Sequence, residues 1–425
     1  KMEAEQTIDH YDTGTVFDWS VEFAEVFEDG GFDVVLANPP YVRQEEIKPK
    51  EYKDKLIELY KEAMTGKSDL FVAFYTRGLQ LLKNGGTHVF VCSNSWLDVG
   101  YGGRLQSYLL KTARVAAVYD SAVERQFASA DVNTIISFIH KQEPSDTDET
   151  IFVSLRAPFL EALSDETKRR ILTKTRSELL TSGSNENGRY EGDKWGGKYL
   201  RAPDIYFTIL EKGKDKFVRL GSIADVRFGI KTGANDFFYL SEEDQAKWQI
   251  EEEFLRPVIK SPRECRSIVV KPEDLKYKLF YCHKDKTELR GTNALEYIKW
   301  GETDNEWLDD DGNPNPPHKR PSCRGRRNWY DVGNRKKPKL SVNYLVNEVM
   351  RSFVKENGIL VSDNFQECHF NGSEQSQVGV SLNSTINQLF ANVSGRANFG
   401  GGLMMIQTYE VASFSVYEAV IDLVS

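Results

Sequence analysis

The first half of the chain alternates short apolar runs with longer segments of helical periodicity. Four apolar runs have the length of strands: residues 32–37, 88–92, 115–119 and 134–139. Three segments place apolar side chains at helical spacing: residues 51–64, 69–83 and 104–111. Strands that alternate with helices indicate an α/β domain with a mostly parallel, doubly wound sheet. We expect residues 32–37 to form a buried strand, and Asn84-Gly85-Gly86 to end the second helix.

The pattern changes after residue 140. Residues 141–180 are charged and partly helical, and residues 181–198 are polar and rich in glycine, as is typical of a linker. Short strands, turns and helices are mixed in residues 199–425. We therefore predict an α/β domain over residues 1–180, a linker over residues 181–198, and an α+β domain over residues 199–425.

The first predicted strand ends in the tetrapeptide Asn38-Pro39-Pro40-Tyr41. Sites in doubly wound sheets lie at the carboxyl ends of strands. These residue types suit a substrate that carries an exocyclic amine on a nucleobase, which is a poor nucleophile because its lone pair is delocalised into the ring. Two acceptors aimed at its N–H groups draw the nitrogen towards a tetrahedral shape. The side-chain carbonyl of Asn38 and the backbone carbonyl of Pro39 are candidates for those acceptors.

The two prolines and the tyrosine extend this interpretation. Proline fixes its own φ and keeps the preceding residue extended, so both acceptors would be held stiffly. Dipoles that are oriented beforehand stabilise developing charge most effectively. The ring of Tyr41 offers a surface on which an extruded base can stack, an interaction worth about 1–3 kcal/mol per base. The alternative interpretation is a proline turn that only ends the strand.

The tetrapeptide after "FDVVLA" resembles the catalytic motif of the amino-methyltransferases that act on N6 of adenine in DNA. Residues 68–86 resemble the next helix of that family, residues 88–97 its next strand and loop, and residues 124–141 a later motif. The resemblance implies a Rossmann-like methyltransferase domain that uses S-adenosylmethionine. It also implies that Asn38, Pro40 and Phe74 contact the cofactor, and that Phe127 packs on the flipped base opposite Tyr41.

The distal half is similar to the target-recognition domains of TaqI-like enzymes, most clearly in residues 228–240 and 382–402. The overall likeness is to single-chain type IIG restriction–modification enzymes. In that family, an acidic, glycine-rich cofactor loop precedes the catalytic motif, and residues 1–37 contain no such turn. The resemblance therefore implies an N-terminally truncated domain. The upstream part of the same polypeptide would carry the rest of the cofactor pocket, and a nuclease domain if one exists.

Two segments of the distal half are candidates for contact with double-stranded DNA. Residues 319–339, the basic stretch, hold nine Lys or Arg residues against one acidic residue. Lys and Arg on phosphates supply position and salt-dependent affinity. A glycine-rich turn near residues 227–235 could reach bases or phosphates, or be an ordinary hairpin turn. The candidates are Arg227, Lys231, Thr232, Asn235, Arg324, Arg326, Arg327, Lys336 and Lys337.

Composition narrows the classes of protein. A net charge of −9 argues against a uniformly basic nucleic-acid binder, although not against a local basic face. No apolar run is long enough to cross a membrane. Five scattered cysteines fit a reducing cytoplasm, and no spacing of Cys or His predicts a metal site.

Three functional hypotheses remain. The first is a site-specific adenine methyltransferase of a restriction–modification system, of which this chain by itself would be inactive because the cofactor loop is missing. The second is a methyltransferase with the same motif that acts on a protein glutamine or on RNA. The third is a non-catalytic DNA-specificity module.

Overall fold

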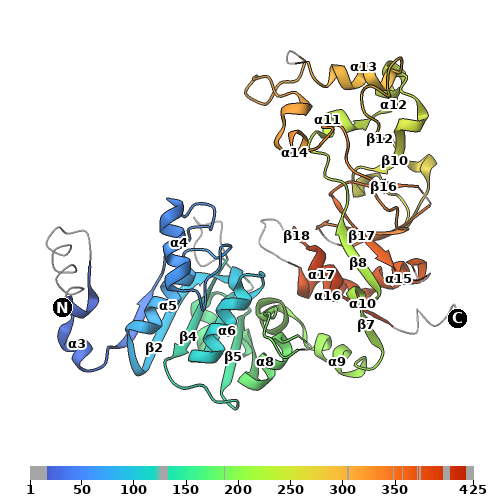
Figure 1. Cartoon of the computed structure of the whole chain (residues 1–425). Helices are drawn as coiled ribbons and strands as arrows, with labels where there is room; N and C mark the ends of the chain where they lie inside the picture. Colours follow the sequence, from blue (N-terminus) through green and yellow to red (C-terminus); the bar gives the residue numbers. More distant parts are fainter. Residues whose placement is uncertain are drawn as a thin grey trace. The chain divides into compact units, whose positions relative to one another are not determined.

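The computed structural model describes residues 17–121, 123, 133–185, 187–303, 306–347, 349–356, 358–370, 372, 375–395 and 403–417. The chain divides into two compact units, Lys1–Ala202 (unit 1) and Pro203–Ser425 (unit 2). Each unit has its own sheets (Figure 1). Each unit also has its own apolar core.

Unit 1 is built on a six-stranded sheet with the order β1-β2-β4-β3-β5-β6. The strands are β1 (Phe32–Ala37), β2 (Leu82–Ser93), β3 (Arg114–Ser121), β4 (Thr134–His140), β5 (Glu149–Leu155) and β6 (Arg169–Thr175). All four predicted strands are confirmed. The sheet is nevertheless mixed rather than mostly parallel: β1 with β2 and β3 with β5 are parallel pairs, whereas β4 runs antiparallel to both of its neighbours and β6 antiparallel to β5.

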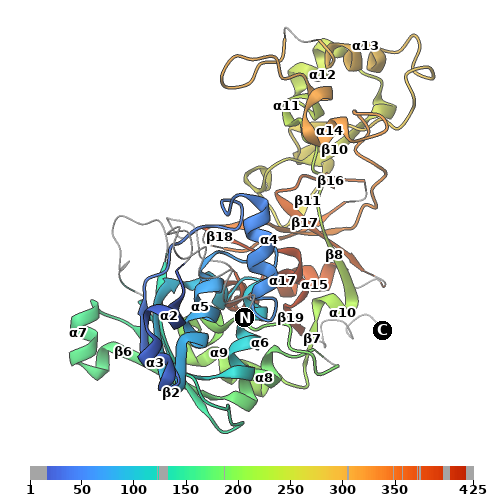
Figure 2. The same ribbon diagram turned by 60° about the vertical axis from the view of Figure 1, so that its left-hand side comes forward.

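The helices of unit 1 follow the predicted periodicity. They are α2 (Trp19–Glu22), α3 (Ala24–Glu28), α4 (Lys50–Leu59), α5 (Phe71–Leu81), α6 (Gly102–Thr112), α7 (Phe159–Ser164) and α8 (Arg176–Gly183). Helix α5 packs on β1 and β2, and α6 packs on β3 (Figure 2). The expected helix stop at residues 84–86 is wrong, because α5 ends at Leu81 and these residues already belong to β2.

Strand β1 differs from the buried strand that we predicted. It is an edge strand, paired only with β2 among the described residues. Two side chains of one face, Val34 and Leu36, are 51% and 71% exposed. The apolar run therefore correctly indicated a strand, but in the described structure nothing covers this face.

Residues 141–201 are more ordered than their composition predicts. The charged segment contains two strands: β5, which is mostly buried, and β6, in which every residue is at least partly exposed. The expected linker is packed into unit 1: Trp195 begins a π-helical turn (Trp195–Arg201) and is fully buried together with Tyr199. The side chain of Asp98 anchors this turn, accepting from the Gly197 amide at 2.9 Å and pairing with Arg201 at 2.7 Å.

Unit 2 contains two larger sheets and small helices. One sheet has the order β11-β15-β13-β17-β8 and the other β16-β10-β12-β9. Their strands are β8 (Ala224–Phe228), β9 (Tyr239–Leu240), β10 (Leu255–Ile259), β11 (Val269–Val270), β12 (Tyr277–Phe280), β13 (Leu340–Asn343), β15 (Ser352–Lys355), β16 (Leu360–Val361) and β17 (Phe365–Phe370). Two short ribbons pair β7 (Phe217–Arg219) with β19 (Ser415–Tyr417) and β14 (Leu345–Val346) with β18 (Met404–Met405).

The helices of unit 2 are short. They are α9 (Asp204–Lys212), α10 (Leu220–Ile223), α11 (Asn235–Phe238), α12 (Glu242–Trp248), α13 (Asn293–Trp300), α14 (Pro321–Arg324), α15 (Gln375–Leu382), α16 (Thr385–Ser394) and α17 (Thr408–Ala412). Together with the two sheets, they make the α+β arrangement that the mixed pattern predicted for this half.

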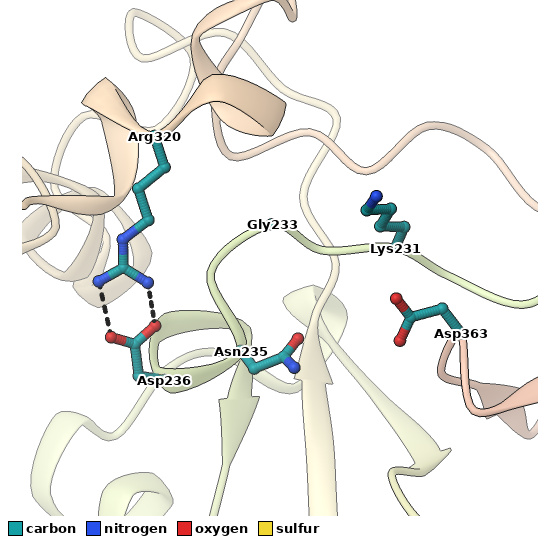
Figure 3. Close-up of a pocket in the computed structure, with 6 residues that line it drawn as sticks. All are labelled: Lys231, Gly233, Asn235, Asp236, Arg320 and Asp363. Atoms are coloured by element: carbon teal, nitrogen blue, oxygen red, sulfur yellow. Dashed lines mark hydrogen bonds and ion pairs between the residues drawn. The ribbon is translucent and has the colours of Figure 1, made fainter. Parts of the chain in front are cut away.

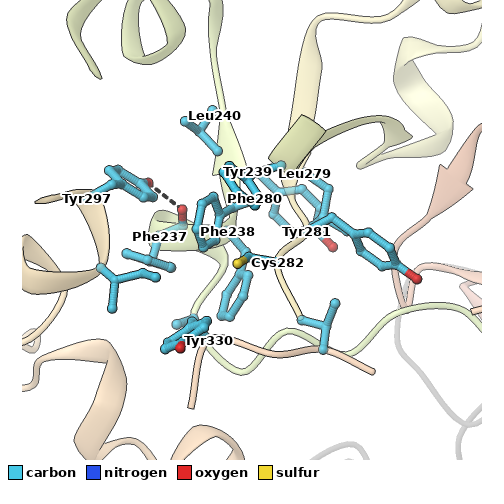
Figure 4. Packing of buried hydrophobic residues seen from close by; sticks show 14 of the residues in the cluster. Phe237, Phe238, Tyr239, Leu240, Leu279, Phe280, Tyr281, Cys282, Tyr297 and Tyr330 are labelled. Atoms are coloured by element: carbon cyan, nitrogen blue, oxygen red, sulfur yellow. Dashed lines mark hydrogen bonds between the residues drawn. The ribbon is translucent and has the colours of Figure 1, made fainter. Parts of the chain in front are cut away.

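An aromatic core lies between α11, α13, β12 and the basic stretch (Figure 4). The ring of Phe237 stacks on Tyr297 with centroids 4.5 Å apart and lies 4.7 Å from Trp329. Trp329 is 8% exposed and Tyr330 is 1% exposed. These two rings of the basic stretch are therefore core residues, and they are not available for stacking on a base.

No helix of the described residues is long and apolar enough to cross a bilayer. No three His, Cys, Asp or Glu side chains gather there as metal ligands would. All five cysteines are buried and unpaired.

Candidate functional site

The predicted catalytic tetrapeptide lies at the carboxyl end of β1. Because β1 and β2 are parallel and Ala37 pairs with Phe90, the loops that follow the two strands leave the same edge of the sheet. Asn38 and Pro40 are exposed, whereas Pro39 is buried. The turn therefore presents the Asn38 carboxamide and one proline ring at this edge, while the other proline anchors the backbone. We call Asn38–Tyr41 the strand-end site.

Asn38 and Tyr41 contact each other directly. The Tyr41 hydroxyl donates a hydrogen bond of 2.6 Å to Asn38 Oδ1 and lies 3.4 Å from the carbonyl oxygen of Val91 in β2. Partial burial, together with the nearby Cys92 thiol, raises the pKa of Tyr41 to about 12. The hydroxyl is therefore a donor at neutral pH, and it fixes the orientation of the Asn38 carboxamide while leaving the second lone pair of Oδ1 open.

A half-buried carboxylate, Asp69, holds the loop that follows the tetrapeptide. Its Oδ1 accepts from the backbone amide of Gln44 at 3.0 Å, and its Oδ2 accepts from the Tyr101 hydroxyl at 2.7 Å. The Tyr101 hydroxyl also lies 2.7 Å from Ser95 Oγ, in the turn after β2. Through these bonds, Asp69 connects the loop after β1 with the turn after β2. Burial raises the pKa of Asp69, an effect that the bonds from Tyr101 and Gln44 oppose.

Sequence reasoning missed Asp69. An acidic residue directly before an apolar helix is ordinarily interpreted as a helix cap. Here the cap position of α5 is Leu70, without a side-chain cap bond, and the carboxylate of Asp69 points to Gln44 instead. No local pattern distinguishes the two roles, because the partner amide lies 25 residues earlier in the chain.

Phe74, the predicted cofactor contact, is unusual on its helix. The neighbouring side chains Phe71, Val72, Ala73 and Tyr75 are at most 5% exposed, whereas Phe74 is 40% exposed. Phe74 shares the exposed face of α5 with Arg77 and Gln80, and an exposed ring on a helix that packs on β1 is a surface where a flat ligand can stack. Phe127, the other predicted aromatic, lies outside the described residues, so its role stays a prediction.

Three predicted DNA contacts from two distant segments come together in unit 2. Arg227 at the end of β8, and Lys336 and Lys337 of the basic stretch, line one cavity of about 410 Å³. Asp225 also lines it and pairs with Arg227 at 2.6 Å, with both side chains more than half exposed. Exposed ion pairs are weak, and the cavity keeps an excess of positive charge, which suits a phosphate.

The other predicted contacts of the basic stretch, three arginines, differ in whether protein atoms bind their charged groups. Arg326 donates to the backbone oxygens of Lys231 at 3.0 Å, Thr232 at 2.6 Å and Trp329 at 3.2 Å. Arg327 pairs with Asp285 at 2.9 Å but remains 85% exposed. Arg324 is exposed and has no such partner among the described residues. Arg326 therefore has a structural role, whereas Arg324 is free to meet a phosphate.

The remaining predicted contacts lie in the turn after β8. Lys231 and Asn235 are exposed and line a second cavity, of about 440 Å³ (Figure 3). Thr232 is 1% exposed, and its hydroxyl donates to Asn235 Oδ1 at 2.5 Å. Its side chain shapes the turn and is not accessible to a ligand.

Unit 1 is an α/β domain with the strand-end site and unit 2 is an α+β domain, and the comparisons with known proteins give the family of the chain. Residues 2–127 match the model of the Eco57I restriction-modification methylase family. Residues 192–423, more than half of the chain, match that of the type II methyltransferase M.Eco57I C-terminal domain. The chain belongs to this family of type II restriction–modification methyltransferases, and the predicted relationship is confirmed.

Individual relatives agree with the family. The chain is 22% identical over 391 residues to the type II methyltransferase M.AccI of Acinetobacter calcoaceticus, covering 88% of this chain and 67% of that protein. It is 25% identical over 252 residues to the type II restriction enzyme and methyltransferase RM.Eco57I of Escherichia coli, covering 55% of this chain and 23% of that protein.

A solved structure shares the fold. The type IIL restriction-modification enzyme MmeI in complex with DNA aligns over 89% of this chain and 46% of its own, with a TM-score of 0.53 and 14% identity. The chain thus spans 67% of M.AccI, 42% of the type II methyltransferase M.BstVI and less than half of MmeI.

Proposed function

We propose that the chain carries the strand-end catalytic site and the DNA-recognition region of a site-specific DNA methyltransferase. The enzyme transfers a methyl group from S-adenosylmethionine to N6 of an adenine that is flipped out of the duplex, within a restriction–modification system. The observation that carries this proposal is the Asn38 carboxamide, which the Tyr41 hydroxyl orients at the end of β1 in a chain of this family.

The chemistry follows from the acceptors at the strand end. The cofactor supplies an electrophilic methyl group, and the chain has to make the adenine amine nucleophilic. The free lone pair of Asn38 Oδ1 and the backbone carbonyl of Pro39 accept its two N–H groups and draw the nitrogen out of conjugation. Positive charge develops on that nitrogen, so neutral acceptors stabilise it without a carboxylate base. The proton that it loses passes to solvent.

The residues around this acceptor fit a cofactor and a stacked base. The exposed rings of Pro40 and Phe74 are the proposed cofactor contacts, together with Asn38. The half-buried ring of Tyr41 is the proposed stacking surface, with Phe127 on the opposite face of the base. Flipping a base costs a few kcal/mol, and stacking on aromatic rings offsets much of this cost.

The exposed face of β1 supports the proposal that further polypeptide belongs to the complete enzyme. An apolar pair such as Val34 and Leu36 on a strand with a parallel neighbour is ordinarily covered, and here the side chains are 51% and 71% exposed. We propose that an upstream part of the same polypeptide covers this face and completes the cofactor pocket. By this proposal, the chain by itself binds duplex DNA but does not turn over.

Identification of the methylated product tests the proposal. The complete enzyme is incubated with duplex DNA and labelled S-adenosylmethionine, the DNA is digested, and the labelled nucleoside is identified by chromatography. Label in N6-methyladenine is expected. Label in a methylated cytosine, or in RNA or protein while DNA stays unlabelled, would contradict the proposal.

The same assay on the chain by itself separates catalysis from recognition. Anisotropy with labelled duplex is expected to show binding that weakens with salt, whereas calorimetric titration with the cofactor and the methylation assay are expected to show neither binding nor product. Robust methylation by this chain would show that the cofactor pocket is complete without further polypeptide.

A further inference from the structure

The second cavity of unit 2 gathers polar groups from four separate segments (Figure 3). Its lining comes from the turn after β8, from α11, from the residue before α14, and from the loop between β16 and β17. The lining residues are Lys231, Gly233, Asn235, Asp236, Arg320 and Asp363. Its two cations and two carboxylates balance, so the cavity carries no formal net charge.

One wall of the cavity is rigid. Arg320 Nη1 and Nη2 donate to the two carboxylate oxygens of Asp236 at 2.6 and 2.7 Å, and Arg320 Nε donates to the Asn315 carbonyl at 3.0 Å. Paired fork contacts of this kind fix both partners. Helix α11, which carries Asp236, is anchored by the fully buried rings of Phe237 and Phe238. Neither charge of this pair is free for a ligand.

The opposite wall offers unused groups. Figure 3 shows the side chains of Lys231 and Asp363 beside one another, and no hydrogen bond or ion pair of the described structure engages either charged group. The Asn235 carbonyl is occupied by Thr232, which leaves its amide N–H groups to donate. The cavity therefore presents a cationic donor, an amide donor and an anionic acceptor within one opening.

This arrangement differs from the cavity of Arg227, Lys336 and Lys337. There, three cations face one carboxylate, which matches a phosphate. A phosphate in the neutral cavity would meet the free carboxylate of Asp363, an unfavourable contact for an anion. Adjacent donors and acceptors instead match the edge of a base pair, which presents both kinds of group in the major groove.

We infer that the neutral cavity reads one G·C base pair in the major groove, with Asp363 accepting from the N4 amine of cytosine and Lys231 donating to O6 and N7 of guanine. Carboxylates and lysines are the side chains suited to those two edges. Asn235 adds a donor beside Lys231. The inference rests on the proposed function, and it deepens it by naming the ligand of this site.

Selection of duplexes from a randomised pool tests the inference through binding alone. The chain captures DNA, bound duplexes are sequenced, and the enriched motif is compared between variants. Asp363→Asn keeps the size of the side chain but adds a donor, and Lys231→Ala removes the cation. The matched controls are Asp310→Asn, at an exposed carboxylate outside the cavity, and Lys299→Ala, at an exposed lysine of α13. Thermal melting confirms that each variant is folded.

The expected result is a wild-type motif with one G·C position that loses its preference by about tenfold or more in Asp363→Asn and in Lys231→Ala. The other positions, the salt dependence and both controls should stay unchanged. Three outcomes would overturn the inference: a motif that neither variant alters, a lost position that is A·T, or a wild-type chain that enriches no motif. Because no methyl transfer is measured, a failure here is distinct from a failure of the methylation assay.

Discussion

In unit 1, the polar side chains of the strand-end site contact partners that fix them in one geometry, whereas in unit 2 the cations of the basic stretch are divided between structural and free roles. Tyr41 holds Asn38, and Asp69 holds the loop behind it. In unit 2, Arg320 and Arg326 bind protein atoms, while Lys336, Lys337 and Arg324 remain exposed. A dense run of like charge is therefore a poor guide to which cations meet a ligand.

The physical cause of this difference is the number of residues that separate each side chain from its partner along the sequence. The hydrogen bond between Tyr41 and Asn38 spans three residues, and a short tetrapeptide carries both partners. The bonds of Arg326 reach back 94 and 95 residues, to a turn in another part of unit 2. A local motif is predictable from sequence because its partners are neighbours in the chain. Which cations bind protein atoms and which stay free is not predictable in this way, because their partners are distant in the chain.

The largest effect is expected from a substitution in the strand-end site itself. In the complete enzyme, Asn38→Ala should lower the single-turnover rate of methyl transfer by about 10²–10³-fold, because one oriented acceptor at the reacting nitrogen is lost. Affinity for DNA should be nearly unchanged. The matched control is Asn84→Ala, at an exposed asparagine of β2. A mutant that keeps more than half of the wild-type rate would remove Asn38 from the reaction.

The next effect distinguishes structural from free cations. Arg326→Ala should lower the free energy of unfolding of unit 2 by about 1.5–3 kcal/mol, since hydrogen bonds from a charged donor to three carbonyls are lost. Arg324→Ala, two positions away, should leave thermal melting unchanged, because this side chain binds no described residue. Equal melting temperatures for the two variants would contradict the structural role of Arg326.

Asp69 is predicted to act through the loop that it holds. Asp69→Ala should lower the methyl-transfer rate about tenfold with little change in DNA affinity, because a small displacement of an oriented group is costly. Asp69→Asn keeps one acceptor for the Gln44 amide and should recover part of the rate. A rate loss that follows a fall in thermal stability, without recovery in Asp69→Asn, would indicate a purely structural role.

Much of unit 1 could be predicted from its sequence, for reasons visible in particular elements. The four predicted strands are present because apolar runs of that length have few alternatives beside helices of clear periodicity. The sequence does not predict strands β5 and β6, because polar residues such as Glu149 and Lys174 interrupt their apolar positions and no residue of β6 is buried. The predicted linker, residues 181–198, includes Trp195 because glycines surround it, whereas the burial of Trp195 depends on contacts with β5.

In unit 2, the sequence indicated the residues of the turn and the basic stretch but not their grouping. Arg227 and Lys336 lie more than 100 positions apart and line one cavity because β8 joins the same sheet as β17 and β13. Asp363, the free carboxylate of the other cavity, has no local signal at all. Such residues emerge only when strands that are distant in sequence pair.

The role of the cavity lined by Arg227, Lys336 and Lys337 can be tested through the salt dependence of DNA binding. If Lys336 and Lys337 each meet one phosphate, the double variant Lys336→Ala, Lys337→Ala should flatten the slope of log K against log salt by about two units, at roughly 0.9 per phosphate. The selected DNA motif should stay the same, since phosphate contacts do not read sequence. Anisotropy from low to moderate salt measures the slope. An unchanged slope would move the phosphate contacts away from this cavity.

The smallest expected effect separates the two roles proposed for Tyr41. Tyr41→Phe removes the hydroxyl that donates to Asn38 but keeps the ring, whereas Tyr41→Ala removes both. Loss of one hydrogen bond is worth about 0.5–1.5 kcal/mol, so Tyr41→Phe should slow methyl transfer by a few-fold, up to about tenfold. Base extrusion, followed through the fluorescence of 2-aminopurine at the target position, should be impaired only in Tyr41→Ala.

Because burial raises the pKa of Tyr41 to about 12, the hydroxyl stays protonated between pH 6 and about 10. The ratio of the wild-type to the Tyr41→Phe rate should therefore be constant over that range. A ratio that falls towards one as pH rises through 8 or 9 would show that the hydroxyl ionises earlier and is not the donor that orients Asn38.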